Sequence, residues 1–333
     1  MRRFFTLIII LLQFAVNAQK VDRQQFFLDD RVIEVTLNTD IKKLLNDKKT
    51  VAWQPATVEM RFSDTSSITA EVKVEPRGEF RKKNCDLASL MLDFKDKGSK
   101  LAALKKLKLV GGCHSSEADE ELLLREFLVY KIYNFISPMS FRVRLLHISY
   151  RDVKSKAKQY TQYAFLIEDL KDLCDRNNCQ ELKKEQIKSF MTDRMHSTLV
   201  CMFQYMIGNT DWSLPNFHNI KFIVPKTDTL AAPYIIPYDF DYCGVVNAAY
   251  AVPAEQFGTT SVRERVYRGN RPTNPDLQQI ITVFKENKEK MMYYINNFPL
   301  LRSGAKKDIV AYLDEFYHLI ESKNSIRSVF NPS

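Results

Sequence analysis

Alternation between apolar and polar residues, the pattern of a strand with one buried face, dominates the first half of the chain. It runs through residues 57–64 and 69–78, which flank a Ser/Asp turn and are predicted to form a β-hairpin. Further strands are expected at 31–38, 87–94, 106–110, 137–150 and 160–169.

Helical spacing of apolar residues takes over in the second half. A stripe of Met and aromatic residues predicts a long helix from 181 to 207, and two closing helices are expected at about 274–296 and 304–321. One helix interrupts the strand-rich half at about 117–135, where one face carries Leu122, Glu126, Tyr130 and Tyr133. The predicted fold class is therefore α+β.

This division predicts two lobes joined by a polar connection. The expected organisation is a β-rich N-lobe of antiparallel strands plus one helix at 19–168, a hinge at 169–180, a mostly helical C-lobe at 181–322 and a polar frayed tail at 323–333.

The N-terminus has the pattern of a secretory signal peptide, predicted to span residues 1–18. Arg2 and Arg3 precede an apolar run from Phe4 to Val16, and small residues allow cleavage near Ala18. The run is shorter than the roughly 20 residues that a membrane span requires. An exported protein without a transmembrane segment in the mature chain is expected, in the periplasm or outside the cell; the alternative is an uncleaved membrane anchor.

Charge and cysteine usage narrow the partners and the compartment. The net charge of +9 suits an anionic ligand such as a nucleotide, but it is too diffuse to indicate nucleic acid. An even count of 6 cysteines in an exported protein favours disulfides. Cys174 and Cys179 are close enough to bridge locally, Cys85 and Cys113 lie at turns, and Cys201 is expected as a buried thiol.

Carboxylates and an amide gather around two short strands after the long helix. Asp211 follows the helix end at Gly208, Asn219 begins a strand, and Asp239 and Asp241 follow the next strand. Oxygen donors of this kind suit a hard divalent cation. The alternatives are ordinary turns and caps, or an isolated calcium site.

Cationic residues upstream supply a possible phosphate-binding face. Lys108 lies on a predicted strand, and Glu126, inside the apolar stripe of the following helix, would need a partner such as this lysine or would be solvated at the edge of the stripe. A turn around Gly78 carries Arg77, Arg81, Lys82 and Lys83, which could cover phosphates or form a solvated hairpin tip.

The order of these features is that of a protein-kinase-like fold. Along the chain come, in order, a strand lysine, a helix glutamate, a strand pair, a connection, a long helix, a loop aspartate, an asparagine and a second aspartate. These are the residue types that phosphoryl transfer requires. The chain has no GxSxG motif, no HExxH motif and no plausible Cys-His pair, which argues against a hydrolase.

The motifs GNTDW at 208–212, HN at 218–219 and PYDFD at 237–241 resemble the spore-coat CotH-type family of atypical secretory kinases, in a divergent bacterial branch. The resemblance covers roughly residues 70–270 and implies a bilobal atypical protein-kinase-like fold that uses ATP and Mg or Mn. It also implies an exported protein, or another hydroxyl compound, as phosphoacceptor.

Carried over by motif, the resemblance implies one role for each candidate. Asp211 would be the catalytic carboxylate; Asn219, Asp239 and Asp241 would hold the metal; Lys108, paired with Glu126, and Arg77 would face the phosphates; and Glu168 would lie on the adenine side.

The chain also departs from the kinase pattern. The gap between Asp211 and Asn219 is longer than usual, which makes Asn216 a rival metal ligand, and there is no HRD or GxGxxG motif. The arginines at 263, 265, 268 and 271 could bind an anionic substrate or be solvated. The alternative function is a catalytically inactive kinase-fold binding protein, a pseudokinase.

Overall fold

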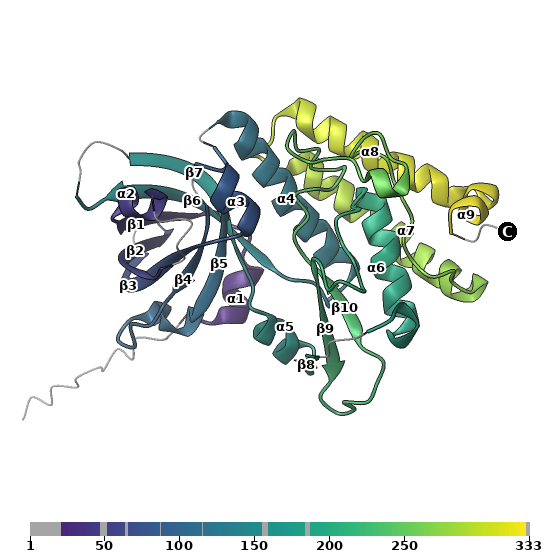
Figure 1. Ribbon diagram of the computed structural model, residues 1–333, viewed down its shortest axis with the longest axis horizontal. Helices are drawn as coiled ribbons and strands as arrows, with labels where there is room; N and C mark the ends of the chain where they lie inside the picture. Colours follow the sequence, from purple (N-terminus) through teal and green to yellow (C-terminus); the bar gives the residue numbers. More distant parts are fainter. Residues whose placement is uncertain are drawn as a thin grey trace, which may run out of the picture.

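Figure 1 shows the computed structural model of the chain, in which a β-rich N-terminal part lies beside a helical C-terminal part. The structure describes residues 21–46, 52–63, 66–86, 88–114, 116–154, 159–183 and 187–330. The predicted signal peptide therefore lies outside the described residues. Within those ranges, no helix is both long enough and apolar enough to cross a membrane.

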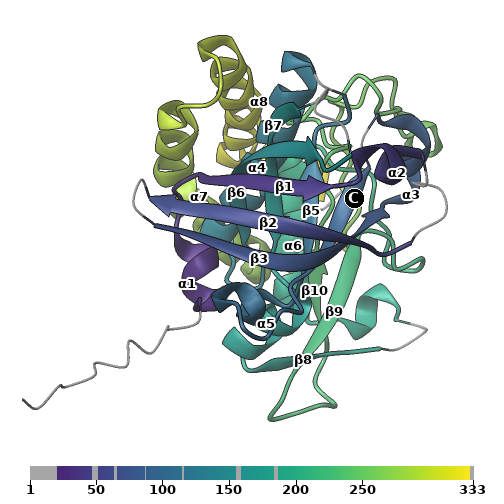
Figure 2. The same ribbon diagram turned by 90° about the vertical axis from the view of Figure 1, so that its left-hand side faces the viewer.

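The N-terminal strands close into a barrel in the order β1-β2-β3-β4-β5-β7-β6 (Figure 2). Neighbouring strands are antiparallel except β1 and β6, which run parallel and complete the ring, with Ile33 opposite Leu146. Closure pairs the strand edges that an open sheet would leave exposed. The strands are β1 (Ile33–Thr39), β2 (Gln54–Ser63), β3 (Ser66–Arg77), β4 (Ser89–Asp93), β5 (Lys106–Gly111), β6 (Val143–Asp152) and β7 (Gln159–Ile167).

The alternating pattern that predicted the strands fills the barrel. Along β1, the buried positions include Val35 and Leu37, and the predicted hairpin is confirmed as β2 and β3. The expectation of purely antiparallel strands and one helix was wrong. Short helices also pack around the barrel, and they hold too few apolar residues to show helical periodicity: α1 (Arg23–Leu28), α2 (Ile41–Asn46), α3 (Glu79–Asn84) and the 3₁₀ turn η1 (Lys100–Leu104).

Helix α4 (Glu117–Ile136) lies between the barrel and the C-terminal helices, as Figure 1 shows. It contacts β6 and β7 on one side and α7 on the other, so even its polar residues Arg125, Glu126 and Lys131 are buried. Arg125 is compensated by hydrogen bonds to the Val245 carbonyl, 3.1 Å, and to Asp308, 2.7 Å. The predicted helix is confirmed, and it is the element that both parts share.

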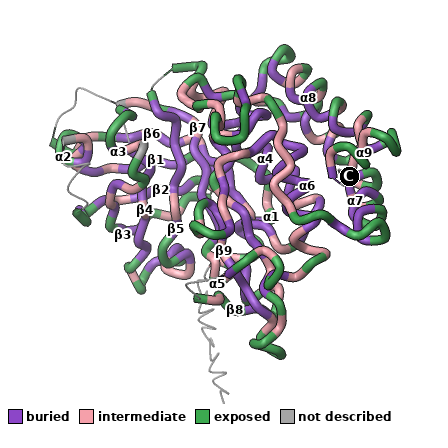
Figure 3. The backbone as a smooth tube through the Cα atoms, turned by 45° about the vertical axis from the view of Figure 1, so that its right-hand side comes forward, coloured by how far each residue is buried: buried purple, intermediate pink, exposed green. Residues whose placement is uncertain are grey.

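The C-terminal part joins helices to a small sheet in the order β10-β9-β8. Figure 3 shows its buried segments continuing from the barrel through α4 and α6. The closing helices were predicted within a residue or two. The elements are α5 (Leu170–Arg176), β8 (Cys179–Glu181), η2 (Ser189–Met191), α6 (Arg194–Ile207), β9 (Ile220–Pro225), β10 (Tyr234–Pro237), η3 (Glu255–Phe257), α7 (Asn274–Asn297), α8 (Ser303–Glu321) and α9 (Lys323–Phe330).

The long helix expected at 181–207 is shorter than predicted. It begins at Arg194, because the Asp193 carboxylate caps it by accepting a hydrogen bond from the His196 backbone N–H, 2.8 Å. Phe190, assigned to the core stripe, is 76% exposed. The segment before the cap holds β8 and η2 instead of helix.

The segments predicted as hinge and tail contain regular elements that are held by specific contacts. The hinge contains α5 and β8, and Arg176 of α5 bonds Glu168 at 2.9 Å. The expected frayed tail is largely helix α9, whose Phe330 is buried against the rings of Tyr205 and Tyr267. These contacts join segments that are distant in sequence, and local polarity does not reveal them.

The structure pairs the two cysteines that lie at turns, and not the two that are close together in sequence. Cys85 and Cys113 form a disulfide, whereas Cys174 and Cys179 are free and buried. Cys201 is a buried thiol, as predicted.

Candidate functional site

A cavity of about 430 Å³ lies where the barrel meets the C-terminal loops. A volume of this order suits a nucleotide-sized ligand. The predicted residues Arg77, Lys108, Asp211, Asn219, Asp239 and Asp241 all line it. The structure therefore brings into one cavity side chains that were proposed from separate parts of the sequence; Glu126 lies directly behind it and Glu168 lies elsewhere.

The loop after α6 fixes both oxygens of Asp211. His218 Nε2 lies 2.9 Å from Asp211 Oδ1, and the Asn219 amide donates to Asp211 Oδ2 at 3.0 Å and to the Asp211 carbonyl at 2.8 Å. A reciprocal pair of backbone hydrogen bonds between Ser213 and His218 closes the loop. Asp211 is thus held in one orientation at the cavity wall.

Gly208 starts this loop in a conformation that other residues adopt rarely. Its φ of 67° is left-handed, and a Cβ at this position would collide with the Tyr312 hydroxyl. The next residue, Asn209, is buried and accepts the Asp211 backbone N–H at 2.9 Å. The helix end therefore determines where Asp211 stands.

The structure distinguishes the two rival asparagines by position. Asn219 lines the cavity with a left-handed φ of 53°, whereas Asn216 is exposed and lies outside the lining. The Asn216 backbone N–H bonds only the neighbouring Ser213 hydroxyl, 3.4 Å, within the described contacts. Asn219 is the asparagine available to a ligand in the cavity.

The segment after β10 contributes the two aspartates. Asp239 has a left-handed φ of 64°, and its backbone N–H donates to the Tyr130 hydroxyl of α4 at 2.9 Å. Asp241 accepts from the Tyr250 hydroxyl at 3.2 Å. Burial, together with the charge of Asp239, raises the pKa of Asp241 to about 6.

Glu126 adds a further buried carboxyl to this group. Burial and the charge of Asp241 raise its pKa well above the usual value. Its Oε2 makes no hydrogen bond within the described part of the chain. Of the carboxyls at the site, Glu126 and Asp241 are buried, whereas Asp211 is partly exposed and Asp239 is exposed. Asn219, Asp239 and Asp241 offer the oxygen donors that a hard divalent metal takes.

The predicted ion pair between Lys108 and Glu126 is not formed. Arg81 takes the partner position: its Nη2 lies 3.5 Å from Glu126 Oε2 and 3.5 Å from Asp241 Oδ2. This happens because the glycine-bearing basic segment folds as helix α3 over the cavity, with Gly78 at a φ of 81° before its first turn. Arg81 also donates to the Gly111 carbonyl at the end of β5.

Lys108 lines the cavity from β5. Its Nζ lies 5.3 Å from the centre of the Tyr238 ring. Burial, followed by the charge of Arg77, lowers the pKa of Lys108 to about 8. Arg77, Arg81 and Lys108 are thus the cationic side chains of a cavity lining that also contains Asp211, Asp239 and Asp241.

Glu168 has a structural role in this conformation. It is 3% exposed and bonds Arg176, while its Oε2 accepts the Arg142 backbone N–H at 3.0 Å. Its neighbour Ile167 lines the cavity instead. The side chain expected on the adenine side therefore anchors α5.

The arginines after residue 260 support the Asp211 loop. Arg268 donates to the carbonyls of Thr210, 2.8 Å, and Trp212. Arg265 donates to the Met206 carbonyl at 3.2 Å, and Arg263 pairs with Asp308 at 3.1 Å. These three are partly exposed and are held by contacts within the chain, whereas Arg271 is exposed.

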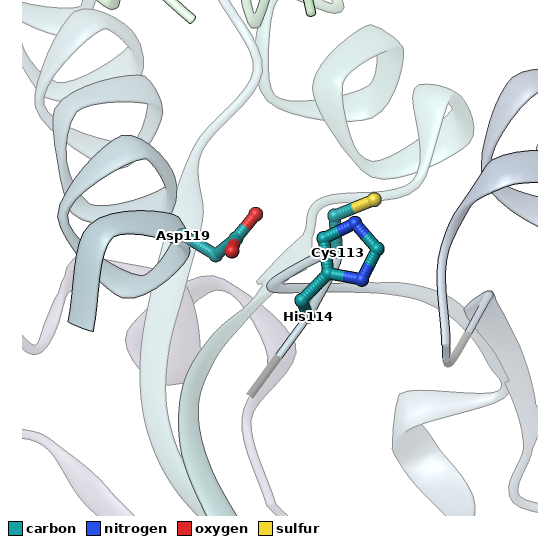
Figure 4. Close-up of side chains that lie close together, drawn as sticks. All are labelled: Cys113, His114 and Asp119. Atoms are coloured by element: carbon teal, nitrogen blue, oxygen red, sulfur yellow. The ribbon is translucent and has the colours of Figure 1, made fainter. Parts of the chain in front are cut away.

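A second cluster, shown in Figure 4, brings together Cys113, His114 and Asp119, whose donor atoms lie within 4.8 Å of one another. Cys113 is bonded to Cys85, and His114 Nδ1 lies 3.1 Å from Asp86. A metal needs a thiolate rather than a disulfide sulfur. This cluster is therefore not a metal site in the oxidised protein.

Arg81, His218 and Tyr130 were missed as site residues. Arg81 was recognised only as one of several charges in a basic turn, and His218 only as part of a motif. Tyr130 follows Glu126 at helical spacing, so a signal for its position was present, but its bond to the Asp239 backbone joins residues 109 positions apart.

Comparison with known proteins adds little. No family model and no curated protein matches the chain. Among solved structures, the proinflammatory kinase CtkA of Helicobacter pylori is similar over 72% of this chain and 92% of its own, with 11% sequence identity and a TM-score of 0.40. The structural neighbour is a kinase, but likeness at this level supports no transfer of function. The functional interpretation therefore depends on the residues of the cavity.

Proposed function

We propose that this protein is an ATP- and metal-dependent phosphotransferase of the atypical kinase type, related to the CotH-type secretory kinases. The observation that carries the proposal is the convergence of Asp211, Asn219, Asp239 and Asp241 in the lining of one cavity with Arg77, Arg81 and Lys108. Phosphoryl transfer needs a cationic wall for phosphates, oxygen donors for a metal and a carboxylate for the attacking hydroxyl.

Each residue has a defined task in this proposal. Asp211 accepts a hydrogen bond from the incoming hydroxyl and takes its proton, while His218 and Asn219 keep the carboxylate in place. Lys108 and Arg77 bind phosphate oxygens. Asn219, Asp239 and Asp241 hold the metal, which neutralises phosphate charge when bound.

The compartment and acceptor follow from the N-terminal pattern. Export is proposed from the signal-peptide sequence and agrees with the disulfide between Cys85 and Cys113, since disulfides persist in oxidising compartments. The proposed acceptor is a Ser or Thr hydroxyl of another exported protein.

Transfer of labelled γ-phosphate from ATP tests the proposal. The protein with Mn²⁺ or Mg²⁺ should label itself or an acceptor, and Asp211→Asn should lower the rate by about 100-fold or more, because the acid–base group is lost. The matched control is Asp228→Asn, a change of an exposed aspartate on the loop between β9 and β10, which should keep full activity. Equal labelling by wild type and Asp211→Asn would refute the assigned role.

One observation favours the pseudokinase as a second candidate. Arg81 already neutralises Glu126 and Asp241 without a metal, which is what a purely structural site requires. If ATP and Mn²⁺ raise the melting temperature but no label is transferred to any acceptor, this second candidate replaces the first.

A further inference from the structure

A basic surface extends away from the Asp211 loop across the C-terminal helices. Arg271 lines two neighbouring cavities, of about 260 Å³ and 540 Å³. The larger also contains Lys323 and Arg327 of α9, above a floor of Leu277 and Ile326. We call Arg271, Lys323 and Arg327, with this apolar floor, the basic groove.

The charges of the basic groove are uncompensated. Within the described ranges, Arg271, Lys323 and Arg327 are exposed and make no ion pair, and neither cavity has Asp or Glu in its lining. The smaller cavity contains Arg194, but Asp276 compensates this residue at 3.0 Å. An anionic ligand would supply the missing charge.

The groove is connected to the proposed catalytic loop. Arg268 donates hydrogen bonds to the carbonyls on either side of Asp211. Arg271 follows Arg268 by three positions, which is at most about 11 Å of extended backbone. Leu214 of the same loop lines the smaller cavity. Phe330 of α9 packs on Tyr267, ring centroids 4.9 Å apart, which fixes α9 to this segment.

The size of the two cavities favours a peptide over a small anion. The cavities, of about 260 Å³ and 540 Å³, share Arg271 and together offer more room than a single phosphate requires, and a flat bilayer does not enter them. Phe190, 76% exposed, offers an apolar contact in the smaller cavity. A chain with acidic and apolar side chains satisfies both features.

We propose that the basic groove binds an acidic segment of the acceptor protein and presents a nearby hydroxyl to Asp211. The identification of the bound protein as the phosphoacceptor rests on the proposed function, but the binding itself requires no phosphoryl transfer. Acidic residues are expected several positions away from the accepting Ser or Thr.

Fluorescence anisotropy without ATP tests the docking. The probe is a labelled peptide with one serine several positions away from a run of glutamates, compared with its glutamine counterpart. The double variant Lys323→Glu/Arg327→Glu should weaken binding about tenfold or more, and added salt should weaken wild-type binding. Lys285→Glu/Lys307→Glu, which reverses two exposed charges on α7 and α8, is the matched control and should bind like wild type.

Several results would overturn the inference: equal binding by wild type and the groove variant, equal binding of the glutamine peptide, displacement by millimolar inorganic phosphate, or association with phosphatidylglycerol vesicles in place of the peptide.

Far-UV circular dichroism and melting confirm that both variants fold. If phosphotransfer is detected, the groove variant should raise KM for the acidic peptide and leave kcat and KM for ATP unchanged. Absence of phosphotransfer with intact peptide binding refutes the kinase proposal alone.

Discussion

At the scale of single residues, Arg81 occupies the position beside Glu126 that was expected for Lys108. Its guanidinium lies 3.5 Å from both Glu126 and Asp241, while the Lys108 Nζ lies near the Tyr238 ring. A guanidinium can contact two carboxylates at once through its fork of N–H groups. Arg81 therefore links α3, α4 and the segment after β10.

Removing Arg81 should destabilise the metal-free protein and increase its response to metal. Arg81→Ala leaves two buried carboxyls without their cation, and we expect a loss of about 2 kcal/mol in the free energy of unfolding, since protonation of these carboxyls offsets part of the cost. Mn²⁺ should then raise the melting temperature more in the variant than in wild type. Arg81→Lys is the control that keeps the charge; an identical Mn²⁺ shift in wild type and Arg81→Ala would contradict the assignment.

Lys108 should make nucleotide binding depend on pH. Burial, Arg77 and Lys221 oppose its positive charge, whereas Asp239 and Asp169 favour it, and the pKa is lowered to about 8. Lys108 is therefore charged at pH 7 and neutral at pH 9, so binding of a fluorescent ATP analogue should be about tenfold weaker at pH 9. Lys108→Arg, which does not titrate in this range, should abolish the difference; a profile that is equally steep in this variant would exclude Lys108 as its source.

At the scale of elements, the disulfide joins the segment that carries Arg81 to the segment that leads into the helix of Glu126. Cys85 directly follows α3, and Cys113 lies between β5 and α4. The Asp86 backbone N–H donates to the Cys113 carbonyl at 2.9 Å beside it. The covalent link thus holds α3 over the cavity.

Loss of this link should reduce both stability and ligand binding. The bond joins residues 28 positions apart, for which the loop-entropy estimate is about 3.6 kcal/mol. Cys85→Ser/Cys113→Ser should melt at a lower temperature and bind nucleotide more weakly, because α3 is no longer held. Reducing agent should lower the melting temperature of wild type and leave the double variant unchanged; a wild type that does not respond to reduction would contradict the expectation.

Elements were predictable where one face of a local pattern is buried. The β2–β3 hairpin and α8 follow from periodicity alone. The start of α6 was not predictable from its stripe, because a single Asp193 cap decides it. The parallel pairing of β1 with β6 joins Ile33 to Leu146, and no local pattern encodes such a contact.

The same distinction applies to the site. Asp211, Asn219, Asp239 and Asp241 lie close together in sequence, and their shared cavity was expected from the order of the strands. The partner of Glu126 was assigned incorrectly, because Arg81 reaches it through the fold of α3, 45 residues upstream. Connectivity of the cysteines was likewise open, since spacing alone does not determine it.

At the scale of the whole molecule, the cavity joins a β-barrel part to a helical part. The arginine and lysine side chains in its lining come from β3, α3 and β5, and the aspartates come from the loops after α6 and β10. A nucleotide bound there would contact both parts and would be bound only by the folded chain, so it should stabilise the molecule as a unit.

Isothermal titration calorimetry with ATP and Mn²⁺ tests the central claim most directly. Wild type should bind one ATP in a metal-dependent manner, and Asp239→Asn should weaken that binding at least about tenfold through loss of an ionised oxygen donor. Asp228→Asn, on the exposed loop, should bind like wild type. Absence of metal-dependent ATP binding by wild type, or identical affinity in wild type and Asp239→Asn, would contradict the account.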